Sequence, residues 1–566
     1  MPIPRSLLAP TRPTDLDLRL TAGEWPARLT GELVLTAPHP DTLGGPHPFF
    51  GEGVVYRLSL EPGTHGADDS TFAWRHRRID SPSARLRHAR PDVFEATMIG
   101  VRSPFGFVNA ANTAPLPWGD RLFTTWDVGR PVEIDAASLS FLGEVGHRDD
   151  WHDFEVAPQP LLPLVMSTAH PVIDPERTVM WTTNQVWGQL WIVCWDGHGP
   201  IRSWPIEGAL IPQSVHTITQ TRDWIIVGDC AFKVEPQVLI GGERTEPTNL
   251  DAPVYLIRKD ALEATPPGTP VPCQRFEIAP EINHYYATWD DADGIAVLFE
   301  HTESSDLSLV SRADDLDGLG RPLDPALVGL YGLPMAPDRT TLVVFDPTTG
   351  AIVHRAEQRE PRRLWGRQLN AMDWSTEGRE APTVHHTVHH GFRPEGITQR
   401  ELALYGDRVD RTLWPDDETP PLVVTSSFPD LAVIAEWQLG LDDMPTSPIF
   451  VPRDPGTSGS RYAGSEPGGH DGWVVVPVLN DAGFRVEVFD AAAVDRGPVA
   501  TLSAGDVTVP FVLHSAWMPR AVAAPTDVDR VRFSDELARL DELDADLAEL
   551  AVQVARDLEE GVPLGS

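Results

Sequence analysis

The chain has 566 residues, of which 41% are hydrophobic, and it carries a formal net charge of −38. This hydrophobic content permits a large core and argues against bulk disorder. The acidic total disfavours nucleic acids and anionic membrane surfaces as main partners, because both require a positively charged binding surface.

The cysteines and the apolar runs bear on the cellular environment. Cys194, Cys230 and Cys273 show no Cys-x-x-Cys spacing. We therefore expect neither a disulfide framework nor a cysteine zinc site, and a reducing, cytoplasmic location fits best. The apolar run at the N-terminus is too short for a signal peptide. No run of about 18 apolar residues occurs, which predicts that the chain has no transmembrane segment.

From about residue 30 to about residue 520 the pattern is that of an all-β protein. Short apolar or alternating runs are separated by Gly, Pro, Asp and Asn turns. Single strands are predicted at residues 189–195 and 253–257, and hairpins at residues 341–354 and 473–490. Units of this kind spread over hundreds of residues favour a β-propeller, with a large sandwich or two β-domains as the alternative.

Four histidines lie at the predicted ends of separate strands. His170 lies between an apolar run and a proline turn, His216 and His284 precede strand-like runs, and His514 follows an apolar run. One such histidine alone is more often structural than functional. The innermost strands of a propeller converge on one axis, however, so four imidazoles at strand ends could meet there.

The residues after about 530 differ in character from the rest. Ser534, followed by two acidic residues, is a good N-terminal cap, and Leu or Val then recurs at three- and four-residue steps as far as Leu558. This pattern predicts an amphipathic C-terminal helix that ends before Gly561. We expect a propeller with its cap over residues 1–530 and a helical extension over residues 531–566. The helix would dock on the propeller or pair with a second copy of the chain.

Five short stretches resemble motifs of the carotenoid cleavage dioxygenase (carotenoid oxygenase) family in order and spacing. They lie at residues 29–40, 49–54, 109–123, 168–175 and 447–453, and the fourth contains Thr-Ala-His-Pro followed by Asp-Pro. The resemblance implies a seven-bladed β-propeller with a helical or loop cap on one face. It also implies a non-haem Fe(II) ion held by four histidines, which are His170, His216, His284 and His514.

The chemistry implied by the resemblance is the cleavage of a C=C bond by dioxygen into two carbonyl products. Four neutral imidazoles suit ferrous iron and leave a coordination position open for dioxygen. The substrate then needs no bond to the metal, so a carotenoid, an apocarotenoid or a similar apolar alkene fits. Transient contact with a membrane would supply such a substrate.

Other histidines compete for a role at the metal. His301, in residues 299–303, is the rival of His284 for the third ligand position, and the sequence around His284 fits the family pattern better. The dense run His385–His390 also has the composition of a metal site. We expect this run to be a solvated loop or strand edge instead, because no family motif falls there.

The residues expected beside the ligands depart from the family pattern. In the family, three glutamates accept hydrogen bonds from ligand histidines. This sequence has Asp127, Ser427 and Ser447 at the corresponding positions. Because a serine hydroxyl brings no charge, the alternative is a non-catalytic propeller that binds an apolar ligand or a protein partner. Trp126 stands where stilbene-cleaving members carry a lysine for a phenolate, which favours carotenoids, apocarotenoids or another apolar alkene.

Overall fold

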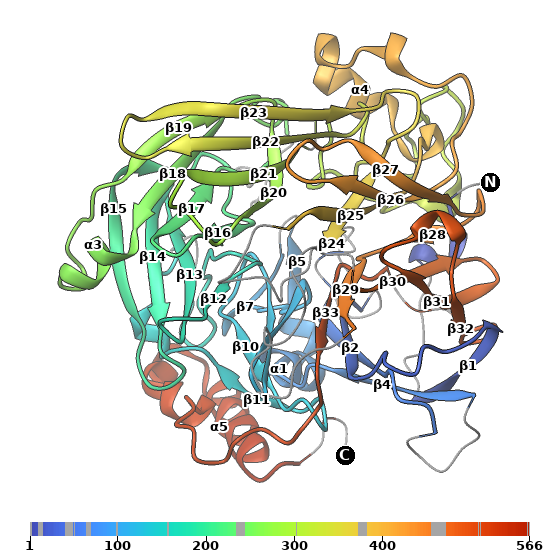
Figure 1. Cartoon of the computed structure of the whole chain (residues 1–566). Coiled ribbons are helices and arrows are strands. Elements are labelled where there is room, and N and C mark those ends of the chain that lie inside the picture. The colour runs from blue at the N-terminus through green and yellow to red at the C-terminus, as the bar shows by residue number, and fades with distance from the viewer. Residues whose placement is uncertain are drawn as a thin grey trace.

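A computed structural model gives the structure of the chain. It describes residues 3–8, 15–39, 49, 51–63, 70–97, 100–154, 158–233, 244–301, 303–371, 382–453, 471–507, 509, 511–562 and 564. The strands form a ring of twisted sheets around a central axis, which Figure 1 views nearly end-on. The predicted all-β propeller architecture is confirmed.

Five four-stranded antiparallel sheets follow one another in chain order around this ring (Figure 1). The first contains β8 (Ala114–Trp118), β9 (Arg121–Thr125), β10 (Val132–Ile134) and β11 (Phe141–Glu144). The second contains β12 (Val172–Asp174), β13 (Val179–Val186), β14 (Gln189–Trp195) and β15 (Arg202–Leu210). The third contains β16 (Ile218–Gln220), β17 (Trp224–Gly228), β18 (Ala252–Arg258) and β19 (Gln274–Ile278). The fourth contains β20 (Ile282–Ala287), β21 (Ile295–His301), β22 (Arg339–Asp346) and β23 (Ala351–Arg359). The fifth contains β24 (Arg367–Ala371), β25 (Val384–His389), β26 (Leu422–Ser427) and β27 (Val433–Gln438).

The remaining strands at the two ends of the chain join in one ten-stranded sheet. Its N-terminal members are β1 (Leu16–Gly23), β2 (Glu32–Pro38), β3 (Gly53–Ser59) and β4 (Thr71–Arg78). Its C-terminal members are β28 (Met444–Pro445), β29 (Ile449–Pro452), β30 (Gly472–Asn480), β31 (Gly483–Asp490), β32 (Ala500–Ser503) and β33 (His514–Met518). A small separate sheet contains β5 (Glu95–Thr97), β6 (Gly100–Ser103) and β7 (Gly106–Phe107).

This ten-stranded sheet corrects the prediction of seven blades. The described residues form five four-stranded blades, because the terminal strands do not separate into sheets of their own. Strand β1 pairs with β32, and β2 pairs with β33, so strands from the two ends of the chain share one hydrogen-bonded ladder. Pairing of the two termini closes the ring and leaves fewer open sheet edges.

The core is divided among apolar clusters that lie between neighbouring sheets. One of them contains Trp181 of β13, Ile192 of β14, Ile225 of β17 and Ile257 of β18, all buried. Since the inner strands are covered by a neighbouring sheet on each face, strands such as β17 are buried at every residue. This burial explains why the sequence reads as short apolar runs rather than as strict alternation.

Short helices and loops cover parts of the ring. They include η1 (Arg5–Leu8), α1 (Pro82–Ala89), η3 (Pro91–Val93), η4 (Arg148–Asp150), α3 (Lys259–Ala264), η5 (Pro325–Leu327), η7 (Pro394–Gly396), α4 (Gln399–Tyr405), η8 (Gly406–Arg408), η9 (Arg411–Leu413) and η10 (Val494–Arg496). Tyr331, Tyr405 and Trp414 bury their side chains in one apolar cluster within the region around α4. This cluster holds the loops that contribute one wall of the central cavity described below.

The C-terminal extension forms two segments and not the single helix predicted from Ser534. The 3-10 helix η11 (Phe533–Glu542) ends before the extended residue Leu543, and α5 (Ala545–Glu559) begins after Asp544. The predicted docking is observed, since Leu547 and Val554 of α5 pack in one cluster with Leu86 of α1. Within the described part of the chain, we find no helix whose length and apolarity would let it cross a membrane.

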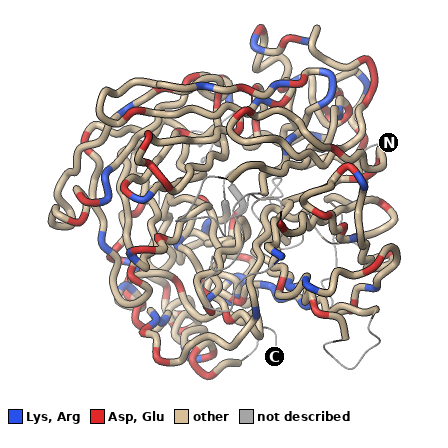
Figure 2. Tube along the Cα trace, viewed as in Figure 1, with Lys and Arg blue, Asp and Glu red and all other residues tan. Residues whose placement is uncertain are grey.

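Charged residues of both signs are interspersed along the chain trace (Figure 2). One pair is fully buried: Lys259, at the start of α3, donates from Nζ to Asp174 Oδ2 at 2.7 Å. The same Nζ also donates to Gln220 Oε1 at 2.9 Å and to the carbonyl oxygen of Thr221 at 2.7 Å. Asp174 ends β12, and α3 follows β18 of the next sheet, so this ion pair joins two neighbouring blades.

We expect Lys259→Met to lower the free energy of unfolding by about 3 kcal/mol, because it leaves the buried Asp174 carboxylate with fewer compensating charges. Arg275→Met removes an exposed ion pair with Glu277 and serves as the matched control, with an expected loss of less than about 1 kcal/mol. Denaturant unfolding of both variants measures the difference. Equal losses would contradict a structural role for the buried pair.

Candidate metal centre

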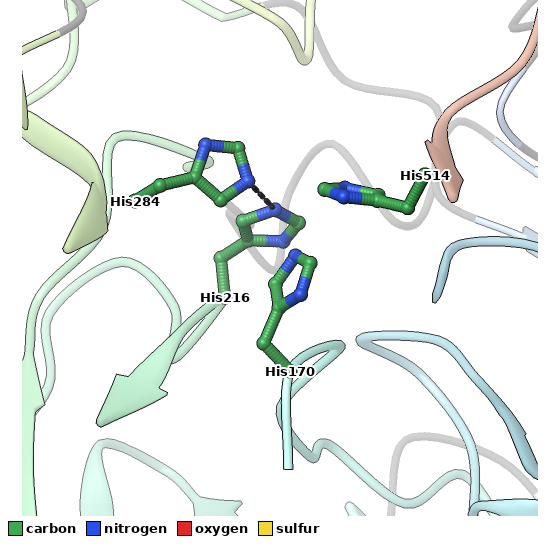
Figure 3. Close-up of side chains that lie close together, drawn as sticks. All are labelled: His170, His216, His284 and His514. Atoms are coloured by element: carbon green, nitrogen blue, oxygen red, sulfur yellow. Dashed lines mark hydrogen bonds between the residues drawn. The ribbon is translucent and has the colours of Figure 1, made fainter. Parts of the chain in front are cut away.

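Four histidines from four sheets converge near the axis of the ring (Figure 3). His170 lies two residues before β12, His216 lies two residues before β16, His284 lies in β20, and His514 is the first residue of β33. Each offers one ring nitrogen, and these four nitrogens all lie within 4.8 Å of one another. The structure thus brings together all four histidines that the sequence singled out.

Backbone contacts between adjacent inner strands hold this arrangement. The amide nitrogen of Ala169 donates to the carbonyl oxygen of His216 at 3.1 Å, and the hydroxyl of Thr168 donates to the same oxygen at 2.8 Å. His170 itself forms a parallel bridge with Thr217. His514 is placed by the pairing of β33 with β2, where it lies opposite Thr36. The closure of the ring therefore supplies the fourth histidine.

The tautomer of His216 follows from its partner. Its Nδ1 lies 2.8 Å from Oδ1 of Asp127, so Nδ1 carries the proton and donates it to the carboxylate. The Nε2 lone pair of His216 then faces the centre, only 3.1 Å from Nε2 of His284. Either His284 carries a proton on Nε2, or two lone pairs are directed towards a common cation. A bound metal ion relieves this repulsion directly.

Three of the rings, those of His170, His284 and His514, are uncharged at neutral pH. Burial, together with the neighbouring histidines, holds the pKa of His170 and of His284 well below the usual range, and burial beside His216 does the same for the pKa of His514. The enclosed Nε2 of His170 has no hydrogen-bond partner. Neutral imidazoles with free lone pairs are good ligands for divalent transition metals, so this donor set fits such an ion.

The three predicted partners of the ligands have different outcomes. Asp127 lies in the loop after β9 and contacts His216, as described above. Ser447 is buried beside the His514 strand, but its hydroxyl donates to the hydroxyl of Ser515 at 2.9 Å instead of facing an imidazole. Ser427 ends β26, and its hydroxyl accepts from the amide of Ala432 at 3.1 Å within its own hairpin. The expectation that Ser427 lies against a ligand is therefore corrected.

Glu300 is a neighbour of the site that the sequence reasoning missed. It lies opposite His284 in the β20–β21 ladder, and its Oε2 is 3.6 Å from Nδ1 of His284. Burial raises the pKa of Glu300 to about 7, although Arg367 opposes this shift. No local sequence signal marks Glu300, because its position beside His284 depends on the register of β20 against β21.

His301, the rival of His284, has a structural role. Its Nδ1 donates to the carbonyl oxygen of Pro280, and its Nε2 accepts from the hydroxyl of Thr341, both at 2.8 Å. Each ring nitrogen is thereby satisfied away from the centre, so His301 does not join the cluster of four.

The prediction of a solvated loop or strand edge at His385–His390 is wrong. These residues form the buried strand β25 and the position after it, between β24 and β26. Burial lowers the pKa of His385, His389 and His390. His389 donates from Nδ1 to Asp338 at 2.6 Å, and His390 donates from Nε2 to the carbonyl oxygen of Pro445 at 2.8 Å. Burial of both faces of β25 keeps these rings neutral and away from solvent.

A cavity lies against the centre and is lined by His216, His284 and His514. Its apolar wall includes Trp126, Phe232, Tyr331, Leu333 and Phe511. Its polar wall includes Asn283, Glu303, Asp338, Arg367 and Gln368. The cavity therefore suits a largely apolar molecule that carries a polar group.

Comparison with known proteins agrees with this arrangement. A profile of the family described as retinal pigment epithelial membrane protein matches residues 6–519. The chain belongs to this family, the carotenoid oxygenases. The match spans the ring and all four histidines, whereas η11 and α5 lie beyond its end.

Two curated relatives match the chain over shorter stretches. Over 142 residues, the chain is 31% identical to carotenoid cleavage dioxygenase 7, chloroplastic, of Oryza sativa subsp. japonica, covering 23% of this chain and 22% of that protein. Over 163 residues, it is 29% identical to apocarotenoid-15,15'-oxygenase of Synechocystis sp., covering 28% of this chain and 31% of that protein. The matched stretches thus span less than a third of the length of either relative.

Solved structures resemble the fold over almost the whole chain. Cobalt-substituted Synechocystis ACO is 15% identical, with a TM-score of 0.59, and the match covers 91% of this chain and 98% of that one. Lignostilbene dioxygenase of Pseudomonas brassicacearum is 18% identical, with a TM-score of 0.60, and the match covers 92% and 100%. At such low identity these matches support the fold alone.

The hydrogen bond to Asp127 predicts an effect on metal binding. We expect Asp127→Asn to weaken metal affinity about 10–100-fold, because it removes the charge that fixes the tautomer of His216. Glu300→Gln should cost less, since its carboxylate lies 3.6 Å from His284, beyond hydrogen-bonding distance. Chelator competition under anaerobic conditions measures the metal affinity of both variants. A larger loss of affinity in Glu300→Gln than in Asp127→Asn would contradict the prediction that Asp127 is the more important of the two.

Burial of His301 predicts a pH dependence of stability. Its pKa falls to about 4 from the ordinary value of 6.5, so between these values the unfolded chain binds a proton that the folded chain does not. His301 therefore does not reduce the free energy of unfolding above about pH 6.5, but it reduces that free energy progressively as the pH falls towards about 4. When the pH is lowered from about 7 to about 5, the free energy of unfolding should fall by roughly 2 kcal/mol less in His301→Gln than in the unmodified protein. Denaturant unfolding at both pH values measures this. The prediction is contradicted if both proteins lose the same free energy of unfolding between the two pH values.

Proposed function

We propose that the protein is a non-haem Fe(II)-dependent dioxygenase that cleaves a C=C bond of a carotenoid, an apocarotenoid or a similar apolar alkene into two carbonyl products. The observation that carries the proposal is the convergence of ring nitrogens from four histidines within 4.8 Å beside a largely apolar cavity. Family membership supports the same class of reaction.

His170, His216, His284 and His514 would hold the iron. When bound, ferrous iron with open coordination positions can activate dioxygen, which is the chemistry that this reaction requires. Asp127 orients His216 through its carboxylate, and Glu300 places a carboxyl group behind His284. With a metal ion bound, these two groups would offset part of its charge in the buried site. Ser447 and Ser515 place a neutral hydroxyl pair beside the strand of His514 instead of a third carboxylate.

The cavity indicates the substrate class. Trp126 and Phe232 provide apolar surface near the centre, while Arg367 and Gln368 provide hydrogen-bond donors in the same cavity. This combination favours an alkene with an oxygenated end, such as an apocarotenoid, over a hydrocarbon that is apolar at both ends. Trp126 also takes up the position where a phenolate-binding lysine is expected for stilbene substrates, which argues against phenolic stilbenes.

A cytoplasmic location and transient membrane contact stay predictions.

The alternative function is a non-catalytic propeller that binds an apolar ligand or a protein partner. The neutral Ser447, which stands where the family pattern has a glutamate and bonds to Ser515 rather than to an imidazole, is the observation that favours it. Glu300 weakens this alternative, because a carboxylate is still present behind a second histidine.

Incubation of the iron-loaded protein with apocarotenoids and carotenoids under isotope-labelled dioxygen tests the proposal. We expect label in the newly formed carbonyl products, faster turnover of the oxygenated alkenes, and no product from His284→Ala. Full iron loading without any labelled product would favour the binding protein. Product without label would indicate isomerase or hydrolase chemistry at the same site.

A further inference from the structure

The C-terminal extension makes a buried contact with Arg130, three residues after Asp127. Glu536, in η11, lies beyond the end of the family match at residue 519, yet its side chain is only 5% exposed. Its carboxylate accepts two hydrogen bonds from Arg130, from Nη1 at 2.7 Å and from Nη2 at 2.8 Å. It also accepts one from the amide nitrogen of Arg148 at 2.8 Å. A bidentate, charge-assisted pair of this kind fixes both position and orientation.

Arg130 belongs to the loop that carries Asp127. This guanidinium is buried with a side-chain exposure of 3%, and it also pairs with Glu144 and donates to the carbonyl oxygen of Gly146 at 2.9 Å. Its own carbonyl oxygen accepts from Nδ2 of Asn109 at 2.8 Å. The position of Arg130 is thus set on one side by the body of the propeller and on the other by the extension.

Ser167 holds the same loop from the side of the ligands. Its hydroxyl donates to the carbonyl oxygens of Gly129 at 2.6 Å and Trp126 at 3.0 Å. Its amide nitrogen donates to the carbonyl oxygen of Asp127 at 2.8 Å. The loop therefore lies between Ser167, three residues before His170, and the Arg130–Glu536 pair.

The position of this loop determines whether the Asp127 carboxylate can reach His216. An aspartate side chain is one methylene shorter than the glutamate expected there, so its carboxylate reaches His216 only if the loop backbone lies close to the ring. The observed Nδ1–Oδ1 distance of 2.8 Å leaves little tolerance for displacement, because hydrogen bonds weaken rapidly beyond about 3.2 Å.

We propose that Glu536 is a positioning residue that acts through Arg130 to hold Asp127 against His216. The C-terminal extension is then a structural part of the metal centre and not an independent appendage. This inference rests on the proposed role of His216 as a metal ligand. It adds a contribution from residues outside the part of the chain that matches the family.

A double-mutant cycle measured by metal affinity tests this link. Glu536→Gln removes the charge that pairs with Arg130 at nearly constant size, and ferrous iron affinity is measured by anaerobic chelator competition. We expect Glu536→Gln alone to lower the iron affinity roughly 10-fold. Added to Asp127→Asn, the same substitution should cause no further loss, because Glu536 acts through Asp127. Asp546→Asn is the matched control, since it removes an exposed ion pair between the same extension and Arg90.

Two results would overturn the inference. One is an unchanged affinity in Glu536→Gln, and the other is an equal loss with and without Asp127, which indicates a general effect on folding. Glu536→Asp, which keeps the charge, serves as a second variant if Glu536→Gln does not fold, and it should recover most of the affinity. Metal affinity is measured without any alkene, so failure of the proposed cleavage reaction is distinguished from failure of this link.

Discussion

The close approach of His216 and His284 is the interaction on which the rest of the site depends. Asp127 fixes the proton of His216 on the side away from the centre, so an unprotonated nitrogen faces His284 at 3.1 Å. Buried lone pairs that face one another are costly unless a donor or a cation lies between them. A divalent ion satisfies both rings at once, together with His170 and His514, and the radial arrangement of strands brings the four nitrogens to one point.

Charge compensation around this centre is distributed unevenly. Asp127 contacts His216 directly, Glu300 lies farther from His284, and the hydroxyls of Ser447 and Ser515 bond to each other near His514. A site with fewer close carboxylates leaves more positive charge on a bound metal and orients one ligand less firmly. The position of the Asp127 loop therefore matters more here than in a site with three close carboxylates, which gives the contact between Arg130 and Glu536 its importance.

The sequence predicted the four histidines and Asp127 because each lies in or beside a short local motif. It missed Glu300, since the role of that residue depends on the register of β20 against β21, which no local pattern specifies. It placed His385–His390 in solvent because residue type alone does not reveal that β24 and β26 cover both edges of the strand. The blade count was wrong for a related reason: pairing between residues far apart, such as Thr36 and His514, joins the terminal strands into one sheet.

Metal analysis of the anaerobically purified protein tests the central claim most directly. Three proteins are compared: the unmodified chain, His284→Ala and His301→Ala. The structure predicts one iron per chain in the unmodified protein, loss of iron in His284→Ala, and retention in His301→Ala, whose ring is satisfied by Pro280 and Thr341. Iron retained in His284→Ala but lost in His301→Ala would contradict the proposed set of ligands.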